Sequence, residues 1–126
     1  LLITGDLSFF YDSNGLWNDY VNASFRIIII NNGGGGIFRI LPGFQNNKLY
    51  SKYIETSQNL KAKQLAKLHG FKYQNRKTKF GLKLALRNFF KPSNKPKILE
   101  ISTSSETSSK TLKSYFKFLS KSELQR

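Results

Sequence analysis

The sequence predicts an α/β domain in which a parallel sheet carries helices on both faces. Short apolar runs alternate with longer segments whose apolar residues recur at helical spacing, and this alternation is typical of parallel sheets. The run from Phe25 to Ile30 contains four consecutive isoleucines. A strand that is apolar on both faces fits the centre of a parallel sheet that is covered on both sides.

The connection to that central strand is predicted to contain a helix. Asp12 or Ser13 can begin it, because either side chain can accept a hydrogen bond from an early backbone N–H. Trp17, Tyr20 and Val21 recur at the spacing i, i+3, i+4, which predicts a stripe facing the core. With the strands before and after it, this helix would form a right-handed crossover.

Three further helices are expected, each with an apolar stripe at helical spacing. The stripes are Ala62, Leu65, Ala66 and His69, then Leu82, Ala85, Leu86 and Phe89, and finally Leu112, Tyr115, Phe116 and Leu119. Gly70 is predicted to end the first of these helices in a left-handed conformation, and Thr78 to cap the start of the second. His69 is interpreted as a last-turn residue that suits the negative helix end.

Two short strands are predicted between these helices, over Phe71–Gln74 and Ile98–Ser102. Glu100 lies in the middle of the second strand, where a carboxylate is unusual. Two readings of Glu100 stay open, since it could orient a site residue or reach solvent at a sheet edge. Between the glycine run and the first of the three helices, Ile37–Leu41 is expected to form a short helix ended by Pro42-Gly43. Residues 44–56 are expected to form a loop that could lie over the site as a lid.

At 126 residues, the chain has the length of one domain. It begins directly on an apolar strand and contains no methionine, so residues 1–126 are expected to be a single domain cut from a larger protein. No run reaches the roughly 18 apolar residues needed to cross a bilayer. The absence of cysteine excludes disulfides and fits a reducing compartment. A cytoplasmic protein without a membrane span is therefore predicted.

The chain is strongly basic, with 21 Lys and Arg against 7 Asp and Glu and a net charge of +14. Such a charge raises the expectation of a nucleic-acid or anionic-membrane partner. The lysines, however, are scattered between Lys48 and Lys121 without an arginine-rich block, and most are expected on the outer faces of helices. We therefore predict that the chain does not bind nucleic acid.

Two polar turns follow the first two apolar strands. Leu1–Thr4 is read as the end of a buried strand and Gly5–Ser8 as its turn, while Asn31-Asn32 and four glycines follow the isoleucine run. Both turns would open at the carboxyl edge of a parallel sheet, where ligands bind. Carboxylate, amide and carbonyl oxygens suit a hard cation, and glycines let the backbone approach a ligand closely. A site for a divalent metal and a diphosphate is one interpretation, and two ordinary turns are the other.

Gly5-Asp6, followed by Asn31-Asn32 some two dozen positions later, resembles the signature of thiamine diphosphate-dependent enzymes. The stretches GDLSFFYDSNGLW and NNGGGGIFRILP are more closely similar to the SEPHCHC synthase family (2-succinyl-5-enolpyruvyl-6-hydroxy-3-cyclohexene-1-carboxylate synthase) of menaquinone biosynthesis. Leu7 stands where the general signature has a third glycine, which is also similar to the synthases. The resemblance runs the full length of the chain, but only its first third carries motifs.

The resemblance implies a residue set around the cofactor. The Asp6 carboxylate, the Asn32 amide and the Gly34 carbonyl would bind Mg²⁺ or Mn²⁺. Ile37, Phe38 and Leu41 would form an apolar wall for the cofactor ring and the second substrate, with ordinary core packing as the alternative for these three. The implied cofactor-binding residues are Gly5, Asp6, Leu7, Ser8, Asn32, Gly34 and Ile37, with Leu7 and Ser8 beside the diphosphate, and the implied substrate-binding residues are Phe38 and Leu41. No catalytic residue is assigned within this chain.

The resemblance also implies a C-terminal thiamine diphosphate-binding domain of a transferase. That enzyme class decarboxylates 2-oxoglutarate and adds the resulting succinyl carbanion equivalent to isochorismate, in a homo-oligomer with the site at the subunit interface. A partner-subunit glutamate activates the cofactor in the family, so the isolated chain is expected to be inactive. The alternatives are another thiamine diphosphate-dependent 2-oxo acid decarboxylase or synthase and, after it, a basic nucleic-acid-binding module.

Overall fold

A computed structural model describes residues 1–41, 49 and 53–123, with the backbone alone for residues 38 and 121–123. The chain divides into two compact units. Unit 1 combines Leu1–Asn31 with Asn59–Ser102, and unit 2 combines Asn32–Gln58 with Thr103–Arg126. Within the described ranges, no helix has both the length and the apolar character that a membrane span requires.

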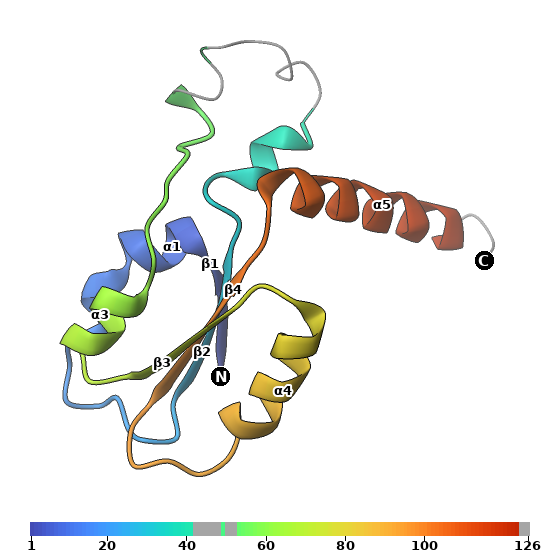
Figure 1. Cartoon of the computed structure of the whole chain (residues 1–126). Coiled ribbons are helices and arrows are strands. Elements are labelled where there is room, and N and C mark those ends of the chain that lie inside the picture. The colour runs from blue at the N-terminus through green and yellow to red at the C-terminus, as the bar shows by residue number, and fades with distance from the viewer. Residues whose placement is uncertain (42–48, 50–52, 124–126) are drawn as a thin grey trace. The chain divides into compact units, whose positions relative to one another are not determined.

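Unit 1 is built on a four-stranded parallel sheet with the strand order β1-β2-β4-β3 (Figure 1). Its strands are β1 (Leu2–Gly5), β2 (Arg26–Asn31), β3 (Lys72–Arg76) and β4 (Lys97–Ser102). The predicted parallel sheet is therefore confirmed, and the isoleucine run forms one of its two inner strands. The prediction that the first strand is buried is wrong, because β1 is an edge strand and its Leu2 and Ile3 are 44% and 61% exposed.

Helices cover both faces of this sheet, as the sequence predicts (Figure 1). One face carries α1 (Asp6–Tyr11), the 3-10 helix η1 (Ser13–Leu16) and α3 (Lys63–Leu68). The other face carries α4 (Lys79–Phe89).

The isoleucines of β2 serve the cores on both faces. Ile27 and Ile29 are fully buried in one cluster, together with Phe9 of α1. Ile28 points to the opposite face, because side chains alternate along a strand, and it packs in a second cluster with Phe89 of α4. Consecutive isoleucines in the middle of β2 therefore suit a strand that is covered on both faces.

The predicted stripes of α3 and α4 are confirmed. Ala62, Leu65 and Ala66 pack in the first cluster, and the stripe of α4 builds the second. Gly70 follows α3 with φ +73°, the left-handed conformation predicted for it. His69 is half-buried at the end of α3, where its backbone N–H donates to the carbonyl of Leu65.

The predicted cap of α4 is also present. The Thr78 hydroxyl accepts a hydrogen bond from the backbone N–H of Gly81 at 3.1 Å. Replacing Thr78 with alanine is expected to lower the free energy of unfolding by about 1 kcal/mol, because one N–H of the first turn loses its partner. Chemical denaturation measures this change. Thr78→Ser keeps the hydroxyl and is the matched control, so equal losses in both variants would contradict the capping role.

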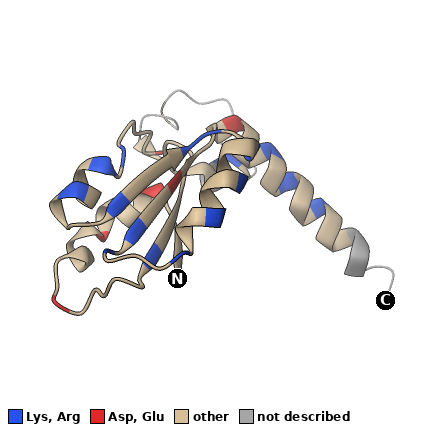
Figure 2. Ribbon diagram, turned by 60° about the horizontal axis from the view of Figure 1, so that its bottom comes forward, with Lys and Arg blue, Asp and Glu red and all other residues tan. Residues whose placement is uncertain are grey.

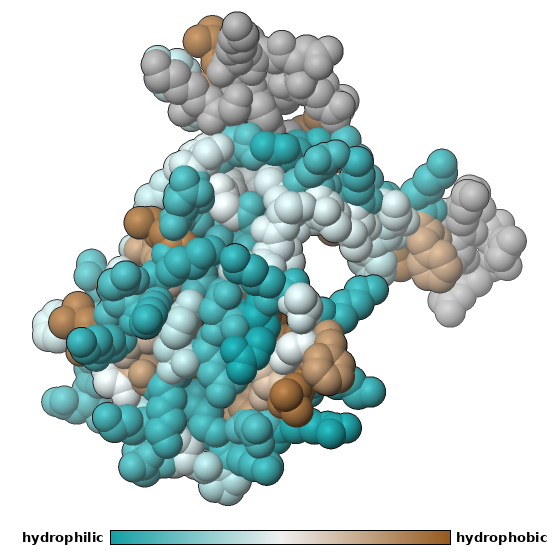
Figure 3. Space-filling model, in the orientation of Figure 1, coloured by the Kyte–Doolittle hydropathy of each residue, from teal (hydrophilic) through white to brown (hydrophobic). Residues whose placement is uncertain are grey.

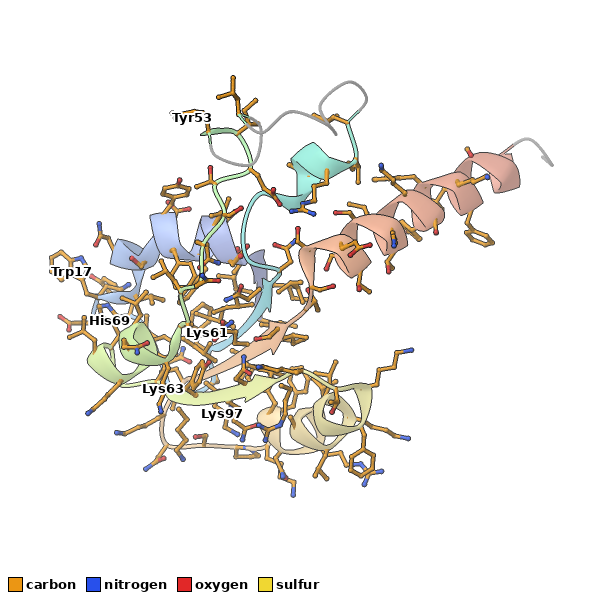
Figure 4. The ribbon with its side chains drawn as sticks, turned by 45° about the horizontal axis from the view of Figure 1, so that its top comes forward. Trp17, Tyr53, Lys61, Lys63, His69 and Lys97 are labelled. Carbon is orange, nitrogen blue, oxygen red and sulfur yellow. The ribbon has the colours of Figure 1, made fainter. Side chains whose placement is uncertain are left out.

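The predicted helix in the first crossover is wrong. The helix begins at Asp6, directly after β1, and η1 follows from Ser13 to Leu16. Of the predicted stripe, only Val21 packs against the core, while the side chains of Trp17 and Tyr20 are 73% and 91% exposed. Figure 4 shows Trp17 pointing away from the ribbon.

Local hydrogen bonds explain this difference. The Asn18 side chain donates to the carbonyl of Gly15 and accepts from the backbone N–H of Tyr20, both at 2.9 Å. Asparagine side chains that bond nearby backbone groups compete with the helical pattern. The spacing of Trp17, Tyr20 and Val21 therefore falls on a segment of turns.

Unit 2 contains the 3-10 helix η2 (Gly36–Arg39) and α5 (Ser105–Glu123). The short helix predicted over Ile37–Leu41 is confirmed as η2, whereas Pro42-Gly43 and residues 44–48 and 50–52 of the predicted lid lie outside the described residues. The last predicted helix is confirmed as α5, but its stripe is not buried. Leu112, Tyr115, Phe116 and Leu119 are 37–53% exposed.

Basic residues are distributed over α3, α4 and α5 rather than gathered in one segment, as Figure 2 shows. The lysines described on these helices are exposed, as predicted. Figure 3 shows a mainly hydrophilic surface on the face drawn, with hydrophobic residues in separate spots.

Candidate functional site

The first two strands end side by side. β1 and β2 pair in parallel with Gly5 opposite Ile30, so their carboxyl ends lie at the same edge of the sheet. Asp6 follows β1 directly, and Asn31 is the last residue of β2. Both residues belong to unit 1, whereas Asn32 and Gly34 belong to unit 2.

Asp6 is a buried acid at the start of α1, with 3% of its surface exposed. Its Oδ1 atom accepts a hydrogen bond from the backbone N–H of Leu7 at 3.0 Å. The other residues of the first turn are more accessible, because Leu7 is half-buried and Gly5 and Ser8 are exposed. The start of α1 thus holds one buried carboxylate beside more exposed residues.

The two neighbouring asparagines have different environments. The Nδ2 group of Asn31 donates to the carbonyl of Leu60 at 3.0 Å and to the Glu100 carboxylate. Asn32 instead has a buried Oδ1 atom without a hydrogen-bond partner among the described residues. A buried polar oxygen without a partner is costly, so Asn32 is the member of the pair that suits a ligand.

The glycine run holds a conformation that other residues rarely adopt. Gly33 and Gly34 have φ values of +81° and +143°. The run is fixed within unit 2 by two backbone hydrogen bonds, from Gly35 N–H to Glu55 O at 2.6 Å and from Gln58 N–H to Gly33 O at 2.9 Å. A Cβ at Gly34 would lie 2.9 Å from the carbonyl oxygen of Thr56, so this position requires glycine.

The Asn32 side chain occupies the space beside Gly36. A Cβ at Gly36 would lie 2.5 Å from Nδ2 of Asn32, so the absence of a side chain there accommodates the asparagine amide. The Gly34 carbonyl accepts a hydrogen bond from the N–H of Gly36 at 2.9 Å.

An ion pair links η2 to the segment opposite the glycine run. Arg39 Nε pairs with the carboxylate of Glu55, which is 2% exposed and also accepts from the Ser105 hydroxyl at 3.3 Å. This pairing was not predicted, because nothing in the local sequence connects these three residues. On the same short helix Ile37 is 61% exposed, and Leu41 beyond it is 42% exposed.

Glu100 is fully buried in β4, between β2 and β3. The sequence left open that Glu100 reaches solvent at a sheet edge, and this reading is wrong because β4 is an inner strand. Its carboxylate accepts hydrogen bonds from Asn31 Nδ2, from the backbone N–H of Ala62 at 3.2 Å and from the Tyr73 hydroxyl. Burial, the hydrogen bond to Glu100 and its negative charge together raise the pKa of Tyr73 well above its ordinary value.

The candidate metal ligands are of three kinds, namely a carboxylate, an amide oxygen and a backbone carbonyl. Among the described residues, no three His, Cys, Asp or Glu side chains gather in a way that could hold an ion. A metal at the predicted turns would therefore need amide and carbonyl oxygens beside one carboxylate. Mg²⁺ accepts such oxygen ligands and usually keeps further positions for water and phosphate.

Comparison with family models finds no match for this chain. It is 50% identical over 118 residues to the 2-succinyl-5-enolpyruvyl-6-hydroxy-3-cyclohexene-1-carboxylate synthase of Christiangramia forsetii, an alignment that covers 94% of this chain and 20% of that protein. The synthase of the same name from Flavobacterium psychrophilum is 47% identical over 119 residues, or 94% of this chain and 22% of the relative.

The synthase of that name from Cytophaga hutchinsonii is 43% identical over 123 residues, which make up 98% of this chain and 22% of the relative. The chain therefore spans about a fifth of the length of the relatives it matches. Over nearly its whole length, the chain is homologous to a segment of the 2-succinyl-5-enolpyruvyl-6-hydroxy-3-cyclohexene-1-carboxylate (SEPHCHC) synthases.

Proposed function

We propose that this chain supplies the metal- and diphosphate-binding part of a longer SEPHCHC synthase. The proposed enzyme depends on thiamine diphosphate and Mg²⁺, decarboxylates 2-oxoglutarate and joins the remaining four-carbon unit to isochorismate in menaquinone biosynthesis. Homology to a segment of the synthases supports the family. The motifs at the ends of the first two strands support the role of this segment.

The residues at these motifs fit the metal. Asp6 offers a carboxylate, Gly34 offers a backbone carbonyl, and Asn32 offers its amide oxygen. The observation that carries the proposal is Asn32 Oδ1, which is buried without a partner among the described residues. A cation bound there would provide the missing contact.

The proposed mechanism assigns positioning tasks to this chain. Thiamine diphosphate, when bound, supplies the electron sink for decarboxylation and carbanion transfer. Asp6 contributes negative charge toward the cation, and the Leu7 N–H holds one of its oxygens in place. The glycines at 33 and 34 hold positive φ values, and their missing side chains leave room for the backbone of residues 55–58, which fixes the loop that carries the proposed Gly34 ligand.

The apolar residues of the second motif are proposed to exclude water. Ile37 and Leu41 are accessible apolar side chains on and just after η2, and Phe38 lies between them in sequence. We propose that these residues pack against the cofactor ring and the second substrate. The remaining substrate contacts and the activating glutamate are proposed to come from other segments and from a second subunit.

Assays on the longer protein that contains this chain test the proposal. Consumption of 2-oxoglutarate is measured with and without isochorismate, each in the presence and absence of Mg²⁺ and thiamine diphosphate. We expect product formation only when all four components are present. Decarboxylation that is indifferent to isochorismate would instead indicate another 2-oxo acid decarboxylase, and turnover without Mg²⁺ or another divalent metal would contradict the proposed site.

A further inference from the structure

The buried carboxylate of Glu100 connects three parts of unit 1. It receives hydrogen bonds from Asn31 at the end of β2, from the backbone of Ala62 before α3 and from Tyr73 on β3. Lys61 Nζ lies 3.9 Å from Oε1 at the solvent-facing side, and Figure 4 shows Lys61 beside the sheet. A buried charge is tolerated when it is paired and hydrogen-bonded in this way.

Glu100 and Asn31 occupy two positions at which apolar residues would extend the core. Ile27, Ile29 and Asn31 alternate onto one face of β2, and Ile98 and Glu100 alternate onto the same face of β4. The three isoleucines belong to the first apolar cluster. On this face the two strands carry polar residues only toward the carboxyl edge of the sheet, where Asn31 and Glu100 lie. Apolar residues in place of a buried polar pair are often neutral or stabilising, so stability alone does not require Glu100 and Asn31.

We propose that Glu100 is a positioning residue for the metal site and acts through Asn31. The Asn31 amide bridges the Glu100 carboxylate and the Leu60 carbonyl, which fixes the last residue of β2. Asn32, the proposed ligand, is the next residue in the chain. This inference rests on the proposed function and adds a supporting contact to it. Groups that orient metal ligands from the outer shell commonly control metal affinity.

Tyr73 provides the matched control. Its hydroxyl donates to the same carboxylate from β3, on the side away from β2. Tyr73→Phe therefore removes one hydrogen bond from Glu100 but leaves the link to Asn31. Asn31→Ser removes the hydrogen bond between Asn31 and Glu100. Glu100→Gln replaces one of the two carboxylate oxygens, both of which accept hydrogen bonds, with an amide N–H₂ group.

The experiment measures Mg²⁺ affinity by calorimetry with thiamine diphosphate present, in the longer protein that contains this chain. Thermal unfolding without ligands is recorded for each variant. We expect Asn31→Ser and Glu100→Gln to weaken Mg²⁺ binding by about tenfold or more. Tyr73→Phe is expected to lower the unfolding temperature while leaving Mg²⁺ affinity unchanged.

Equal losses of Mg²⁺ affinity in Tyr73→Phe and Asn31→Ser would overturn the inference, as would unchanged affinity in both Asn31→Ser and Glu100→Gln. If neither of these two variants folds, Glu100→Asp replaces them with the same expectation, because it keeps the charge and withdraws it by one methylene. A wild-type protein that binds no Mg²⁺ with thiamine diphosphate would contradict the proposed function itself, and the inference with it.

Discussion

Replacing Asp6 with alanine is expected to abolish Mg²⁺-dependent binding of thiamine diphosphate by the longer protein. Asp6 supplies the single carboxylate among the three proposed ligands, and the two others are neutral oxygens. A hard cation that bridges to a diphosphate depends on such a charge. Calorimetric titration of the cofactor with and without Mg²⁺ measures the loss, and Asp6→Asn separates the effect of charge from that of shape.

Asp12→Ala is the matched control for this prediction. Asp12 is an exposed residue that follows α1, so its replacement removes the same charge from the same segment. Mg²⁺-dependent cofactor binding is expected to persist in Asp12→Ala. Undiminished binding in Asp6→Ala would show that the cation is held elsewhere.

Replacing Gly34 with alanine is expected to have the second-largest effect. The φ of +143° is one that L-residues rarely adopt, and the added Cβ would meet three backbone atoms of residues 55–57 at 2.9–3.1 Å. These backbone atoms cannot move away from the added Cβ as the end of a flexible side chain could. A loss of stability of about 1–3 kcal/mol follows from the strained backbone alone. Chemical denaturation measures this loss, and Mg²⁺ titration measures the accompanying loss of cation affinity.

Gly15→Ala is the control for Gly34→Ala. A Cβ at Gly15 meets nothing within 4 Å, and its φ lies outside the left-handed region. The stability of Gly15→Ala is therefore expected to match that of the wild type closely. If Gly34→Ala were equally stable, the glycine run would not need the conformation described here.

The parts of the fold that the sequence predicts well are those fixed by strong periodicity. The run from Phe25 to Ile30 predicts a central strand, because only a strand covered on both faces can bury successive apolar side chains such as Ile27, Ile28 and Ile29. Leu82, Ala85 and Phe89 predict the buried side of α4 in the same way, and Thr78 marks its start. In these segments, local preference and tertiary packing agree.

The first crossover shows where periodicity misleads. Trp17, Tyr20 and Val21 have helical spacing, but Asn18 bonds the backbone around Gly15 and Tyr20 and favours turns. The helix begins instead at Asp6, in the segment Gly5–Ser8 that the sequence predicts as a turn. Phe9 supplies the buried contact that holds this helix on the sheet.

The candidate site is predicted from the sequence as two turns, after β1 and β2, and the resemblance implies that Asn32 and not Asn31 is the ligand. The sequence does not predict the contacts that engage Asn31. These contacts come from Glu100 and Leu60, which lie 69 and 29 positions from Asn31. Contacts between such distant positions form only when the strands are ordered in the sheet, so no local pattern carries them.

The place of β4 has a consequence for how the protein is made. Of the strands that the structure describes it comes last along the chain, yet it lies between β2 and β3 and pairs with both. While the ribosome is still producing residues 97–102, the isoleucine strand has one open edge, and β3 has no neighbour to join. Chains with unpaired apolar edges are prone to aggregation, so we expect a chain that stops before Lys97 to aggregate more readily than one that contains β4.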